Sequence, residues 1–76
     1  MINIEPLMKD TVESFFKVKV NEFYKTQGIY VAEVKDYYFC IRYEVSRFGV
    51  VVKAIKKDTD KVLNIFVDMI DAKKYW

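Results

Sequence analysis

The sequence predicts one small α+β domain in which an antiparallel sheet packs against helices. Residues 29–57 form three runs rich in β-branched and aromatic residues, with short turns between them. Apolar residues recur at helical spacing before and after this region. A chain of 76 residues is enough for one domain. We therefore expect a three-stranded antiparallel meander, or a four-stranded one if the N-terminal segment is extended, packed with a C-terminal and an N-terminal helix.

The N-terminal segment fits two conformations. Pro6 suits the first turn of a helix, and Met8, Val12 and Phe16 recur at helical spacing. The preferred interpretation is a helix that continues to about residue 25. Residues 16–20, however, alternate between apolar residues and lysine, as a strand does. A helix that ends before about residue 13, followed by an additional strand, is therefore the alternative, and residues 14–26 remain open between helix and strand.

The central meander is defined by alternation and by turns. We expect strands at residues 29–35, 37–45 and 50–57, and the short connections between them require antiparallel pairing. In the middle strand, alternate residues point to opposite faces of the sheet. The expected buried face carries Tyr37, Phe39, Ile41, Tyr43 and Val45, and the expected outer face carries Tyr38, Cys40, Arg42 and Glu44.

The C-terminal segment predicts a helix. Asp58 or Thr59 provides an N-cap, and two lysines at 73 and 74 are favourable in a last turn. A narrow polar stripe leaves a wide apolar arc, which we expect to pack on the sheet. The predicted core comprises Val12, Phe16, Val31, Phe39, Ile41, Tyr43, Val50, Val52, Phe66, Met69 and Ile70.

The residue types argue against an enzyme. The chain has no histidine, which is the commonest general base and a frequent metal ligand. Cys40 is the single cysteine and has no histidine to activate it, and two glycines cannot build a glycine-rich phosphate loop. Helix capping and solvent exposure explain the carboxylates of the C-terminal segment. We therefore expect no catalytic residues, no metal site and no cofactor.

Composition also limits location and partners. The net charge of +2 is too small to imply nucleic-acid binding by itself. A single cysteine fits a reducing compartment, and neither a secretory signal nor a membrane-spanning apolar run is visible. We expect a cytoplasmic protein, located in the host cytoplasm if it is viral, without membrane contact.

The first functional hypothesis is a non-enzymatic protein-binding module. Its small size, its 17% aromatic content and its lack of catalytic residue types are similar to those of small phage or mobile-element proteins that inhibit or redirect a host or defence protein. Aromatic, basic and apolar groups on one sheet face suit protein contacts, and terminal aromatic residues suit binding hot spots. The expected partner-binding residues are Tyr38, Arg42, Lys53, Ile55, Tyr75 and Trp76.

The alternative hypothesis is a nucleic-acid-binding domain that uses a basic strip and the outer sheet face. With the long N-terminal helix, the order helix–strand–strand–strand–helix resembles that of the double-stranded-RNA-binding domain, whose last helix also begins with basic residues. That family's histidine-bearing loop is absent. A homodimer that completes its core through the last helix is a third expectation, compatible with either function. The expected nucleic-acid-binding residues are Arg42, Lys53, Lys56, Lys57 and Lys61.

Overall fold

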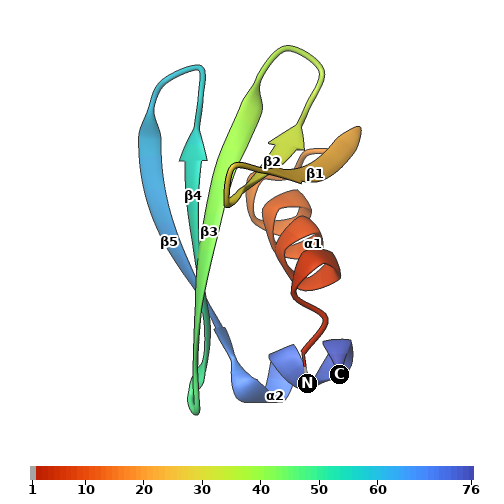
Figure 1. The fold of residues 1–76 in the computed structure, drawn as a ribbon, viewed down its shortest axis with the longest axis vertical. Coiled ribbons are helices and arrows are strands. Elements are labelled where there is room, and N and C mark those ends of the chain that lie inside the picture. The colour runs from red at the N-terminus through yellow and green to blue at the C-terminus, as the bar shows by residue number, and fades with distance from the viewer. Residues whose placement is uncertain (1) are drawn as a thin grey trace.

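The computed structural model describes residues 2–76 and shows an α+β fold with a five-stranded antiparallel sheet (Figure 1). An N-terminal helix precedes the sheet, and a short helix and a 3-10 turn follow it. No helix within residues 2–76 has the length and apolar character needed to cross a membrane. The elements are α1 (Ile4–Phe16), β1 (Glu22–Thr26), β2 (Ile29–Glu33), β3 (Tyr38–Ser46), β4 (Gly49–Lys56), β5 (Lys61–Asp68), α2 (Met69–Ala72) and η1 (Lys73–Tyr75).

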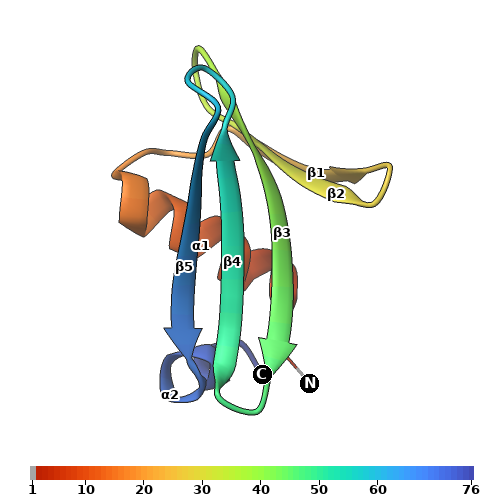
Figure 2. The same cartoon turned by 90° about the vertical axis from the view of Figure 1, so that its left-hand side faces the viewer.

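The strands lie in the sheet in their sequence order, β1-β2-β3-β4-β5, and every neighbouring pair is antiparallel. Helix α1 crosses one face of the sheet, which we call the inner face (Figures 1 and 2). The opposite face, which we call the outer face, carries no helix from the described residues. The predicted meander is confirmed as β2, β3 and β4, with boundaries that differ by one or two residues from those expected.

The preferred interpretation of the N-terminal segment is wrong, and its alternative is closer to the structure. Helix α1 ends at Phe16, because Lys17 adopts a left-handed conformation with φ of 57°. The carboxylate of Glu13 then accepts a hydrogen bond from the backbone N–H of Val20 at 2.8 Å. This contact directs the chain away from the helix axis, so that Glu22–Thr26 forms the additional strand β1.

The predicted C-terminal helix is also wrong, because Lys61–Asp68 forms strand β5. A turn that includes Asp60, with φ of 55°, reverses the chain and places β5 beside β4. A helix begins only at Met69, where the Asp68 side chain accepts from the Asp71 N–H at 3.0 Å. The sheet therefore has five strands rather than three or four, and the element order differs from that of the double-stranded-RNA-binding domain. A homodimer built on the last helix loses its structural basis.

The core lies between α1 and the inner face of the sheet. Of the predicted core, Val12, Phe39, Ile41, Val50 and Val52 are buried there, and Phe16 and Met69 are half-buried. Val31 is buried on the outer face instead. Tyr43, Phe66 and Ile70 are exposed, so their assignment to the core is wrong. Phe66 lies on the outer face because residues 61–68 form a strand, and Ile70 lies on a helix of only four residues. The core that the sequence did not predict comprises Leu7, Met8, Val20, Tyr30, Ala32, Ala54 and Ala72.

Candidate functional site

The outer face carries an apolar row that crosses all five strands. Residues directly opposite each other on neighbouring strands share a face of the sheet. The strand registers therefore place one residue from each strand in a single line across the outer face. Val31, which lies on β2 in this line, is buried although no helix within residues 2–76 covers the outer face. The row consists of Tyr24, Val31, Cys40, Ile55 and Val62.

The structure brings together four of the six residues expected to bind a partner protein. Arg42 lies opposite Lys53 on the outer face, and Ile55 lies opposite Cys40 in the apolar row. Tyr38, at the start of β3, shares that face with Arg42 because four positions separate them. Tyr75 and Trp76 are not part of this group. They lie at the C-terminal end of the chain, on the side of the sheet where α1 packs (Figure 1).

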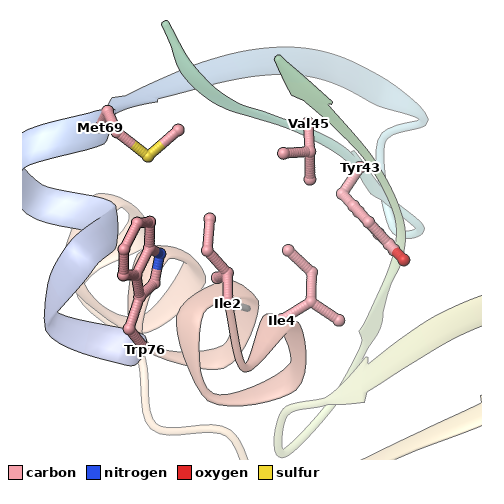
Figure 3. Close-up of a pocket in the computed structure, with 6 residues that line it drawn as sticks. All are labelled: Ile2, Ile4, Tyr43, Val45, Met69 and Trp76. Carbon is pink, nitrogen blue, oxygen red and sulfur yellow. The ribbon is translucent and has the colours of Figure 1, made fainter. Parts of the chain in front are cut away.

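A second surface is a wide apolar hollow of about 520 Å³ at the end of the molecule where both termini lie (Figure 3). Figure 3 shows side chains from four parts of the chain arranged around one open space. Trp76 is 62% exposed, although it lines the hollow. The only N–H or O–H groups on the lining side chains belong to Trp76 and Tyr43. The lining residues are Ile2, Ile4, Tyr43, Val45, Met69 and Trp76.

Backbone hydrogen bonds hold the walls of this hollow in place. The N–H of Asn3 donates to the carbonyl oxygen of Tyr75 at 2.7 Å, which joins the two termini. The N–H of Met69 donates to the carbonyl oxygen of Phe48 at 3.1 Å, which ties α2 to the turn between β3 and β4. A side-chain bond holds the residue before Trp76, because the Tyr75 hydroxyl donates to the Asp10 carboxylate at 2.7 Å.

The hollow adjoins an unpaired strand edge. Strand β2 pairs with β3 only as far as Tyr30, which lies opposite Ile41. Beyond that point β3 continues beside β4 alone, so the other edge of residues 42–46 has no backbone partner within residues 2–76. All five of these residues are exposed. Tyr43 and Val45 belong both to this free edge and to the lining of the hollow.

The predicted basic strip is divided by the fold. Arg42 and Lys53 lie together on the outer face. Lys56 points to the inner face, where its ammonium lies 4.8 Å from the Tyr37 ring centre and 3.3 Å from the Asp58 carboxylate. Of the remaining predicted cations, Lys57 lies in the turn between β4 and β5, and Lys61 is the first residue of β5.

Acidic neighbours reduce the positive field of the turn between β4 and β5. The Lys57 ammonium is 2.7 Å from the Asp60 carboxylate, and this hydrogen bond raises the pKa of Lys57. Lys61 lies opposite Lys56 in the hairpin that the same turn connects. The structure therefore does not gather the five cations into one continuous surface.

Sequence reasoning missed most of the hollow. It assigned Tyr43, Val45 and Met69 to the buried side of a sheet or helix and gave no role to Ile2 or Ile4. Two isoleucines placed before and at the start of a helix, outside any other apolar pattern, were the available signal. Among residues 2–76, no group of three His, Cys, Asp or Glu side chains is placed to hold a metal ion.

Comparison with known proteins gives no relative: no family model, curated protein or solved structure matches this chain.

Proposed function

We propose that this chain is a non-enzymatic protein-binding module that holds an extended segment of a partner protein at the apolar hollow and the free edge of β3. The observation that carries the proposal is that Tyr43 and Val45 belong to both features. A ligand that pairs with this edge is thereby placed to insert side chains into the hollow.

The free edge favours a peptide over a small molecule. Unpaired backbone N–H and C=O groups in a row match the hydrogen-bonding groups of another extended chain. Strand addition of this kind supplies affinity through the backbone and specificity through pockets for alternate side chains. Five exposed residues, 42–46, provide an edge long enough for a short added strand.

The hollow favours an apolar or aromatic side chain on that peptide. Its volume of about 520 Å³ is large enough for one or two such side chains, and its walls offer little to a charged group. Aromatic residues such as Trp76 and Tyr43 provide large contact areas at low cost in side-chain entropy, which is why they recur in binding hot spots.

Charge at the upstream end of the edge favours an acidic residue in the partner segment. Lys25 and Arg42 line a smaller hollow of about 340 Å³ near the point where the pairing between β2 and β3 stops. A carboxylate placed there would meet two cations. A module that occupies a partner segment in this way would inhibit or modulate that partner, which is the role we expect for the chain.

The proposal is tested with peptides selected from a random display library against the whole chain. Val45→Lys should weaken binding of the selected peptides by about thirtyfold or more, as loss of a hot spot does. Trp76→Ala should weaken it in the same direction. Tyr38→Ala and Lys53→Ala are the matched comparisons, since Tyr38 and Lys53 lie on the outer face and outside the free edge of residues 42–46.

Two results would contradict the proposal. A library that yields no binder after repeated selection would argue against a peptide site. Selected peptides that lose affinity with Tyr38→Ala and Lys53→Ala, but not with Val45→Lys, would place the binding site on the outer face. Circular dichroism melts of every variant separate loss of binding from loss of folding.

A further inference from the structure

Strand β5 is the least protected edge of the sheet. The sheet has three free edges among the described residues: β1, residues 42–46 of β3, and the whole of β5. The first two carry charged residues within the strand. In β5, charge is confined to the ends, at Lys61 and Asp68, and the six residues between them include no charged residue, proline or glycine. Proteins usually protect exposed edges with such residues, because a bare edge pairs with another strand.

Apolar surface lies on both sides of this edge. On the outer face, Val62 is 52% exposed and Phe66 is 56% exposed. On the inner side, Ile65 lines a hollow of about 310 Å³ together with Phe15 of α1, which is itself exposed. Figure 2 shows the C-terminal end of α1 projecting beyond β5. A strand added to β5 would therefore cover apolar groups above and below the sheet as well as complete the backbone pairing.

We propose that β5 pairs antiparallel with β5 of a second copy of this chain, so that two five-stranded sheets join into one of ten strands. A two-fold dimer requires one surface to be complementary to itself. The sequence of β5 meets this requirement in one register, in which Asn64 lies opposite Asn64 of the second copy.

In that register, four of the five apolar side chains of β5 meet an apolar side chain of the second copy. On the outer face, Val62 lies opposite Phe66 of the second copy, and this pair occurs twice in the dimer. On the inner face, Leu63 lies opposite Ile65. The two Asn64 amides can bond to each other across the axis, and such cross-strand pairs are the unit of sheet stabilisation.

The alternative registers support the same choice. At the ends of the interface, Lys61 of one copy lies opposite Val67 of the other, so the choice rests on the apolar pairs between them. Only shifts of two residues keep the outer face on the same side of the joined sheet. One such shift places Val62 opposite Asp68 and Phe66 opposite Asn64, and it loses both apolar pairs of the outer face.

Self-pairing is independent of the proposed peptide site. The free edge of β3 lies on the side of that strand that faces β2, away from β5, so it stays open in the dimer. A dimer would present two such sites in one rigid sheet, which would raise affinity for a partner with two matching segments. Either inference can fail without the other.

Light scattering on the whole chain tests the dimer, with concentrations from about 1 μM to about 1 mM to span weak and strong association. The expected mass rises to twice the chain's 9.1 kDa. Val62→Lys and Phe66→Glu should each raise the dissociation constant by about a hundredfold, because two outer-face pairs are lost in each dimer. Val45→Lys is the control, since Val45 is equally exposed but lies on β3.

Charge exchange tests the register. Combining Val62→Lys with Phe66→Glu in one chain places opposite charges across both pairs, and the double variant should dimerise more tightly than either single variant. Mixing the two single variants should likewise give a heterodimer, since one Lys–Glu pair forms and one Val–Phe pair remains. Equal loss in single and double variants would overturn this register.

Hydrogen exchange on the unaltered chain keeps the test valid if a variant fails to fold. Amides of β5 should lose protection on dilution from the dimer to the monomer, whereas those of β4 should not change. A monomer at every concentration, or exchange in β5 that does not depend on concentration, would overturn the proposal.

Discussion

The hydroxyl of Tyr75 donates a hydrogen bond to the carboxylate of Asp10 at 2.7 Å, across 65 positions of sequence. Asp10 lies on α1, and Tyr75 lies in the last turn of the chain. This contact fastens the C-terminal segment, including Trp76, against the helix. Together with the backbone bond from Asn3 to Tyr75, it holds the wall of the hollow that Trp76 provides.

This contact predicts that Tyr75 ionises at an unusually high pH. Partial burial, together with the bond to Asp10, raises the pKa of Tyr75 to about 12. An acid whose pKa is raised by folding stabilises the fold fully below its unfolded pKa of about 10, and this stabilisation is lost as pH rises through about 12. Ultraviolet titration should show a tyrosinate step near pH 12 that Tyr75→Phe removes. An unchanged titration in that variant would contradict the assignment.

The position of Gly49, at the turn between β3 and β4, leaves no room for a side chain. A Cβ atom at this position would overlap the carbonyl oxygen of Val67 and approach the Cα atom of Asp68 to 2.9 Å. Gly49→Ala should therefore lower the free energy of unfolding by about 3 kcal/mol, since backbone of β5 must move. Urea denaturation measures this.

Gly28 provides the matched control for that substitution. Its φ is +78°, but nothing lies within 4 Å of the position of a Cβ atom. Gly28→Ala should cost only about 1 kcal/mol, which is the penalty of a left-handed conformation without a clash. Equal losses at the two glycines would show that the close approach of β5 to Gly49 is absent.

We expect Glu13 to stabilise the fold at the end of α1. Its carboxylate accepts the N–H of Val20, and its backbone carbonyl accepts the N–H of Val18 at 3.2 Å. Glu13→Ala should lower the free energy of unfolding by about 1–2 kcal/mol, because the Val20 N–H loses its acceptor. Glu13→Gln keeps an acceptor and should lose less than half as much. If the two variants were equally destabilised, the negative charge rather than the hydrogen bond would be responsible.

The centre of the sheet could be predicted from the sequence because two signals agree there. In β3, alternation and β-rich composition point to the same structure, and Phe39 and Ile41 are buried as expected. The placement of Arg42 opposite Lys53 on the outer face also follows from this alternation.

The C-terminal strand could not be predicted because its two faces are both apolar. Leu63, Ile65 and Val67 face inward, while Val62 and Phe66 face outward, so no alternation between apolar and polar residues appears. The polar residues of this segment happen to be spaced as they would be on one face of a helix. The β-branched residues of this run and the turn at Asp60 were the signals for a strand.

The hollow could not be predicted for a different reason. Its walls come from the first and last residues, from β3 and from α2, and no sequence pattern links them. Tyr43 and Val45 lie on the inner face as expected. They remain exposed because α1 and the C-terminal segment do not cover the hollow that they line.

The fluorescence of Trp76 tests the central claim most directly. Trp76 is the single tryptophan of the chain and lies in the wall of the hollow, so its emission reports on that site alone. A library-selected peptide without tryptophan should shift this emission to shorter wavelength, and the shift should disappear in Val45→Lys while it persists in Tyr38→Ala. Emission that stays unchanged while calorimetry records binding would contradict a partner site in the hollow.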